Sequence, residues 1–221
     1  TRPLAERNSK LAIEKIAISP EASPPGLDDP LAGLVETLAT QLQAARRRGA
    51  SVILVYGAHV IKNGCGPLLV WLMEQGWVTH LATQGAGIIH DWEFAYAGRS
   101  SESVAENTPA GRFGTWEETG LAINLAALAG GAEGLGLGQA VGRFINHDGW
   151  VLPMAEGLAE QIAAEPDHPL TAARADLLAA IRRFDLAAGP VRLPHSHKSY
   201  SVTAGAERLG VPLTVHPGIG Y

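Results

Sequence analysis

Residues 51–64 read SVILVYGAHVIKNG, and residues 78–92 read VTHLATQGAGIIHDW. Each stretch opens with a strand-like run and passes directly into a loop that contains glycine. The fully apolar run at 51–56 is typical of a strand that is buried on both faces of a parallel sheet, so we expect it to be central. Between the two stretches, residues 67–76 begin with proline and end with glycine, as helices do. The sequence therefore predicts a parallel strand, helix and strand unit.

The flanking sequence extends this unit. Residues 211–216 (VPLTVH) read as a third strand after a helix over 199–209. Apolar residues recur at intervals of three and four from Leu31 to Leu42, which predicts an amphipathic helix that ends at Gly49. The predicted fold class is α/β, with a Rossmann-like parallel sheet flanked by helices.

The length of 221 residues predicts one α/β domain over residues 1–221. Residues 1–30 contain several prolines and little periodicity, and we expect them to form an N-terminal arm. Residues 100–190 are mainly helical in composition and are predicted to be an insertion. Because three strands are fewer than the five or six of a typical sheet, we expect the natural chain to continue beyond Tyr221.

The composition excludes several classes of protein. With 46% hydrophobic and 18% charged residues, the chain is predicted to fold. A net charge of -5 argues against a nucleic-acid partner, and no apolar run approaches the roughly 18 residues of a membrane helix. The single cysteine, Cys65, cannot form an internal disulfide, which favours a reducing compartment and a cytoplasmic location.

The candidate site lies in the loops that follow the three predicted strands. Ligands of open parallel sheets bind outside the carboxyl ends of the strands, where small residues let a phosphate or ribose approach the backbone. His59 and Lys62 are suited to act as a base and an anion contact. His90 and Asp91 are the predicted catalytic residues, for substrate polarity or proton transfer. The predicted cofactor-binding residues are Ala58, His59, Lys62, Asn63, Gln84, Gly85, Ala86, Gly87, His216 and Gly218.

Three segments together resemble a known family. These are GAHVIKNG and VTHLATQGAGIIHDWEFAYAG within residues 56–98, and KSYSVTAGAERLGVPLTVHPGIG at 198–220. Over about half of the chain, they resemble deoxyhypusine synthase and its bacterial and archaeal relatives. The resemblance implies a Rossmann-like sheet, a homo-oligomer (dimer or tetramer) and NAD as cofactor. It also places the loop from Ala58 to Asn63 beside the dinucleotide, and Gln84 to Gly87 near its phosphates or ribose.

The function that this resemblance implies is that of an NAD-dependent transferase acting on a polyamine or a related small-molecule amine. His90 and Asp91 match acidic positions that contact cofactor and polyamine in that family. The sequence departs from the family at Ile89-His90-Asp91, where the family has consecutive carboxylates. The family's catalytic lysine lies downstream of the loop at His216, so neither Lys62 nor Lys198 takes its role.

Two alternatives remain open at this point. One is a metal-dependent hydrolase that uses His59, His90, Asp91 and His216, although the leading interpretation assigns no metal site. The other is a non-catalytic oligomeric homologue that has kept the fold and lost the site. Bound metal would identify the first, and tight assembly without a small-molecule ligand would identify the second.

Overall fold

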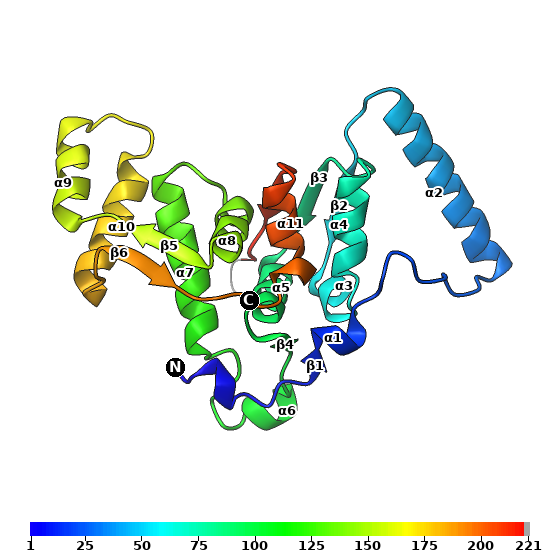
Figure 1. Cartoon of the computed structure of the whole chain (residues 1–221), viewed down its shortest axis with the longest axis horizontal. Helices are drawn as coiled ribbons and strands as arrows, with labels where there is room; N and C mark the ends of the chain where they lie inside the picture. Colours follow the sequence, from blue (N-terminus) through cyan, green and yellow to red (C-terminus); the bar gives the residue numbers. More distant parts are fainter. Residues whose placement is uncertain (219–221) are drawn as a thin grey trace.

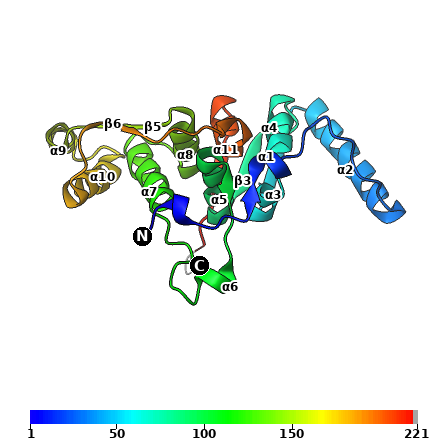
Figure 2. The same ribbon diagram turned by 60° about the horizontal axis from the view of Figure 1, so that its bottom comes forward.

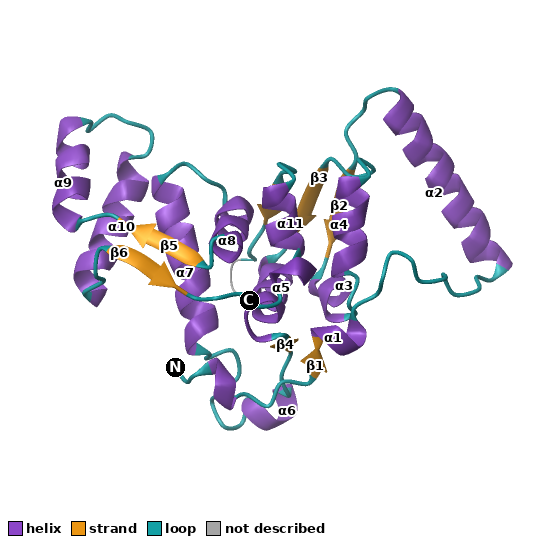
Figure 3. Ribbon diagram, in the orientation of Figure 1, coloured by secondary structure: helices purple, strands orange, loops and turns teal. Residues whose placement is uncertain are grey.

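The computed structural model describes residues 1–218 and contains helices packed around three small sheets (Figures 1 and 3). The helices are α1 (Ile13–Ile16), α2 (Asp29–Arg47), α3 (Ala58–Lys62), α4 (Gly66–Glu74), α5 (Gly85–Ala97), α6 (Val104–Asn107), α7 (Glu117–Ala132), α8 (Leu137–Asn146), α9 (Ala155–Ala164), α10 (Thr171–Phe184) and α11 (Val202–Arg208), with 3-10 turns η1 (Leu4–Glu6) and η2 (Lys198–Tyr200). The strands are β1 (Leu11–Ala12), β2 (Ile53–Tyr56), β3 (His80–Thr83), β4 (Arg99–Ser100), β5 (Gly149–Leu152), β6 (Gly189–Arg192) and β7 (Leu213–Val215).

The three strands predicted from sequence form one parallel sheet, in the order β2-β3-β7. Tyr56, Thr83 and Val215 are aligned across the three strands, so all three carboxyl ends lie at one edge of the sheet. α4 forms where proline and glycine predicted a helix at 67–76, and α11 lies within the helix predicted at 199–209, whereas α3 forms where a loop was predicted. The α/β fold class with a helix-flanked parallel sheet is therefore confirmed.

The prediction that the first strand is central and buried on both faces is wrong. β2 pairs only with β3 and forms an edge of the sheet. Ile53 and Val55 are 60% and 75% exposed, whereas Tyr56 is buried. An apolar run does not alternate between apolar and polar residues, so it does not show whether one face of the strand or both are covered. The exposure of one face of β2 could therefore not be predicted from sequence.

One face of the sheet is packed against α4 and α11. Leu81 and Leu213 share this face with Tyr56, because residues aligned in adjacent parallel strands point the same way. They form a buried cluster with side chains of the two helices, and α5 adds Phe94 to it. The residues aligned on the opposite face are Ile53, Val55, His80, Ala82 and Thr214.

Residues 100–190 are mainly helical, as predicted, and α7, α8 and α10 surround a second buried cluster. Trp92 of α5 belongs to this cluster, so α5 is shared by both cores. Two strands here were missed by the sequence analysis: β5 and β6 pair antiparallel although they lie some forty positions apart along the chain. Within residues 1–218, no single helix is long and apolar enough to cross a membrane; α7 and α8 meet that length and composition only as a pair, bent by 112°.

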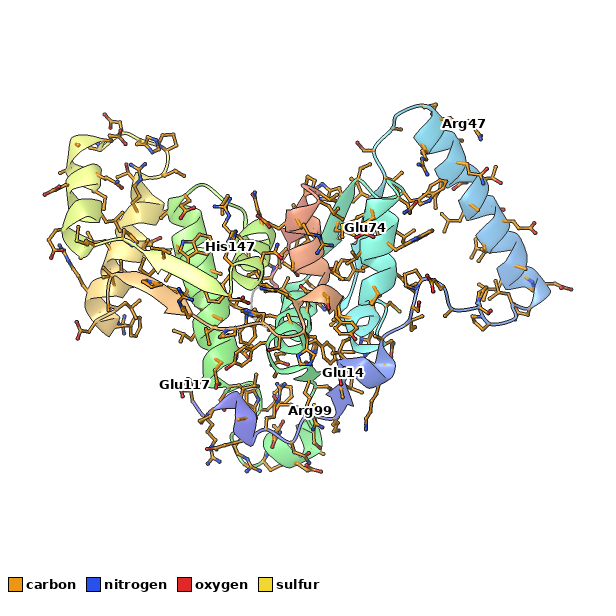
Figure 4. All side chains as sticks on the ribbon, viewed as in Figure 1. Glu14, Arg47, Glu74, Arg99, Glu117 and His147 are labelled. Carbon is orange, nitrogen blue, oxygen red and sulfur yellow. The ribbon has the colours of Figure 1, made fainter. Side chains whose placement is uncertain are left out.

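Residues 1–30, predicted to be an arm, contain two different parts. Leu4 and Ile13 are buried, and β1 pairs antiparallel with β4, so the first part is attached to the body. Residues 19–30 are exposed and lead into α2, which has no buried residue and projects away from the sheet in both views (Figures 1 and 2). Figure 4 places Arg47 at the end of this projecting helix.

Candidate functional site

Two helices begin at the carboxyl edge of the parallel sheet. α3 follows β2 through Gly57, and α5 follows β3 through Gln84. A Cβ built on Gly57 or on Gly85 meets no atom within 4 Å, so the space above both helix starts is open. The first backbone N–H groups of a helix have no acceptor within it and carry partial positive charge. This edge can therefore receive an anionic group such as a phosphate.

The start of α5 is held against the strand by close packing. Gln84 caps the helix, and its side-chain oxygen accepts a hydrogen bond from the Gly87 amide at 3.1 Å. A Cβ on Gly87 would lie 2.2 Å from the Thr83 hydroxyl, so glycine is required there. That hydroxyl donates a 2.9 Å hydrogen bond to the Tyr56 carbonyl and links the two strand ends. In this loop, therefore, Gly85 has open space beside it, whereas Gly87 is packed closely against Thr83.

The remaining predicted cofactor residues lie around the same edge with different exposure. His59, Asn63, His216 and Gly218 are exposed, and Lys62 and Ala86 are partly buried. Ala58 is buried beneath the start of α3. The backbone amide of His216 donates to the Thr83 carbonyl, which ties the third loop to the second. The three predicted loops therefore lie at one edge, and their roles in binding stay a prediction.

His90 lies on α5, one turn beyond the glycines, with its ring partly buried. Its Nδ1 lies 2.7 Å from Ser100 Oγ, and Ser100 donates its only hydroxyl proton to Glu93. Nδ1 of His90 must then be the protonated nitrogen and donate to Ser100, which leaves Nε2 with its lone pair. Burial lowers the pKa of His90 below its usual value; Glu93 opposes that change and Lys62 adds to it. His90 is thus a neutral imidazole able to accept a proton.

Asp91 is fully enclosed and directs its carboxylate at the start of α11. One oxygen accepts from the Val202 amide at 2.9 Å, and the other accepts from the Ser201 hydroxyl at 2.6 Å and the Thr203 amide at 3.0 Å. Burial raises the pKa of this carboxyl, and the hydrogen bonds oppose the rise. The geometry gives Asp91 a structural role, and its predicted catalytic role stays untested.

A buried ion pair that was not predicted from sequence lies next to the site. Arg7 donates two hydrogen bonds to Glu93, at 2.6 and 2.8 Å, and both side chains are almost inaccessible. Glu93 also accepts from Ser100 and from Thr119 of α7. Arg7 precedes Glu93 by 86 positions, so no local pattern could have revealed the pair. The pair attaches the N-terminal segment to the helix that carries His90.

His195 is buried among aromatic rings of the second core. Trp92, Tyr96 and Phe144 surround it edge-on, with ring centroids 5.6 to 5.9 Å away. Within residues 1–218 neither ring nitrogen has a hydrogen-bond partner, and a carboxylate oxygen of Asp148 lies 3.7 Å from Nδ1. Burial lowers the pKa of His195 to about 4, against the attraction of Asp148.

The stability of the fold should therefore fall in mild acid. Because the pKa of His195 is lower in the folded chain than its usual value of 6.5, the unfolded chain takes up the proton first. The contribution is complete above pH 6.5 and is lost as the pH falls towards 4. Unfolding in urea at pH 7.5 and pH 5 should show a loss of about 2 kcal/mol that His195→Phe abolishes. Equal pH dependence in the variant would contradict this role.

No group of three or more His, Cys, Asp or Glu side chains is placed to hold a metal ion within residues 1–218. The set proposed for a hydrolase, His59, His90, Asp91 and His216, is thus not assembled, since Asp91 is committed to α11.

A cavity of about 510 Å³ lies elsewhere. It is bordered by α8 and the β5–β6 pair, with Arg143, Trp150 and Arg192 in its lining. None of the predicted site residues borders it. The loops that carry the predicted residues converge instead at the carboxyl edge of the sheet.

Comparison with known proteins gives one family match. Residues 36–135 match the family described as arginine dihydrolase ArgZ-like, C-terminal, Rossmann fold. No curated protein matches the chain. A crystal structure of a conserved LOR/SDH protein from Methanococcus maripaludis S2 is 15% identical, with a TM-score of 0.40, and the match covers 91% of this chain. The chain spans about half (48%) of that protein.

The family match overturns the predicted resemblance to deoxyhypusine synthase. Two of the three segments that carried that resemblance, within residues 56–98, lie inside the segment that matches the ArgZ-like Rossmann domain, and the third, at 198–220, lies outside it. The predicted identity and the polyamine transferase function are therefore wrong. The shared features were those of a glycine-rich Rossmann edge, which unrelated families have in common. Over residues 36–135, the chain is similar to the C-terminal Rossmann domain of ArgZ-like proteins.

Proposed function

We propose that this chain is a nucleotide-binding Rossmann domain, and that its ligand is a nicotinamide dinucleotide held at the carboxyl edge of β2, β3 and β7. The observation that carries the proposal is the open space above Gly57 and Gly85, where two helices begin directly after neighbouring parallel strands. A dinucleotide pyrophosphate binds at such a position through backbone amides and the helix dipole. The match to a Rossmann-fold family model supports the same ligand class.

The neighbouring side chains are consistent with this ligand. Lys62 supplies a positive charge at the edge, and His59 and Asn63 offer polar groups from the same loop. His90, as a neutral imidazole one turn along α5, is proposed to accept a proton from a substrate bound beside the nucleotide. The matched family is named after an arginine dihydrolase. The segment of this chain that matches, residues 36–135, corresponds to the C-terminal Rossmann fold of that family.

The test is calorimetric titration of NAD into the wild-type chain and into Gly85→Val. Because nothing lies within 4 Å of a Cβ at Gly85, the variant should fold normally while its side chain fills the space for a phosphate. We expect its Kd for NAD to rise at least tenfold. Gly157→Val, a glycine of α9 with equally open surroundings, is the matched control and should bind as the wild type does. Equal affinity in the two variants would refute the site.

A further inference from the structure

The face of the parallel sheet opposite α4 and α11 is left bare at its outer edge. Ile53 and Val55 of β2 are 60% and 75% exposed on this face. Sheets made only of parallel strands occur almost always with both faces covered, because their strands are apolar on both sides. β2 is apolar on both faces, and within residues 1–218 nothing covers Ile53 and Val55 on this face.

The same chain carries a helix that lacks a partner. The apolar stripe of α2 consists of Leu31, Leu34, Val35 and Leu38, each between 45% and 64% exposed. α2 buries no residue, and its attachment to the body is at its C-terminal end, where Arg46 lies 4.3 Å over the Trp77 ring. Both ribbon views show α2 standing away from the sheet (Figures 1 and 2).

We propose that these two surfaces bind each other between two copies of the chain, so that α2 of each copy covers the bare sheet face of the other. Because each copy supplies one helix and one bare face, the contact is self-complementary and closes as a two-fold dimer. Exchange of one element between identical chains needs only a change at its hinge. The short connection between Arg47 and Ile53, with Gly49 at φ 63°, is that hinge.

The area of the exchange is sufficient for a specific dimer. The 19 residues of α2 form a helix about 28 Å long and about 10 Å wide. Laid on a sheet, such a helix buries on the order of 600 Å² counted over both surfaces. Two reciprocal contacts bury on the order of 1,200 Å², the lower limit for stable protein interfaces. If α2 packed on the sheet of its own chain, it would also cover the face. It would then have to leave the extended position that it has in the structure.

The first measurement is sedimentation of the full chain at micromolar concentrations. The wild type should sediment as a dimer of the 23.2 kDa chain. In Leu34→Glu/Leu38→Glu the stripe is charged, and we expect at least a hundredfold weaker dimerisation. Thr40→Glu/Gln43→Glu adds the same charge elsewhere on α2, at exposed polar positions, and should remain dimeric. The far-ultraviolet dichroism of all three proteins should agree, since none of the altered side chains is buried.

Thiol cross-linking identifies the occupant of the sheet face. In a Cys65→Ser background, one chain carries Leu38→Cys and a second, tagged chain carries Val55→Cys. Mixed and treated with a short bismaleimide, they should give a covalent pair containing one chain of each kind. A double variant that cross-links only within one chain would show that α2 folds back on its own sheet and would overturn the proposal. A wild-type monomer at every concentration would overturn it as well, leaving the face to a different protein or domain.

Discussion

Replacing Arg7 with methionine should destabilise the fold by about 3 to 5 kcal/mol, because it leaves the Glu93 carboxylate buried without its counter-charge. Arg7 and Glu93 are 3% and 2% exposed at their side chains, so water cannot replace the lost guanidinium. Ser100 and Thr119 would still donate to the carboxylate, which should keep the loss near the lower end of this range. The measurement is the free energy of unfolding in urea at pH 7.

Two further variants make this result specific to the buried pair. Arg99→Met removes an arginine from the exposed end of the nearby strand β4, labelled in Figure 4, and should cost less than about 0.5 kcal/mol. Adding Glu93→Gln to Arg7→Met removes the uncompensated charge and should restore part of the lost stability. If Arg7→Met and Arg99→Met were equally stable, the N-terminal segment would not be held by this ion pair.

The second large effect is expected at Asp91. Asp91→Ala removes the acceptor of three hydrogen bonds at the start of α11 and should cost about 3 kcal/mol or more, since buried donors are left unpaired. Val202, Ala204 and Ala206 are fully buried, so α11 cannot shift to expose these amides to water. Thermal and urea unfolding measure the loss, with Asp176→Ala on the exposed side of α10 as control. If the free energy of unfolding were unchanged, the structural role of Asp91 would be refuted, and only its predicted catalytic role would remain.

Local patterns were enough to predict the elements that carry the site. Apolar runs followed by glycine located β2 and β3, and spacings of three and four located α2. The loops at Gly57 and Gly85 were predicted to lie together because carboxyl ends of parallel strands share an edge, and they do. These predictions needed only neighbours in sequence.

The features that sequence could not supply depend on distant pairs. Asp91 reads as an acid near a helix start, but its partner helix begins 111 positions later. β5 and β6 each hold four residues, and Pro190 argues against a strand until its edge position is known. The exposure of Val55 depends on what covers the sheet, which no residue of β2 encodes. Tertiary contacts therefore decided burial, although local sequence decided element type.

The most direct test of the central claim is an amide NMR titration of the 221-residue chain with NAD, because it locates binding without assuming where it occurs. We predict that the amides of Gly57, Gly85 and Ala86 shift most, since they lie at the two helix starts on the sheet edge. Shifts confined to Arg143, Trp150 and Arg192 would place the ligand in the cavity beside β5 and β6. That result, or no shift at millimolar NAD, would contradict the assignment of the sheet edge as a dinucleotide site.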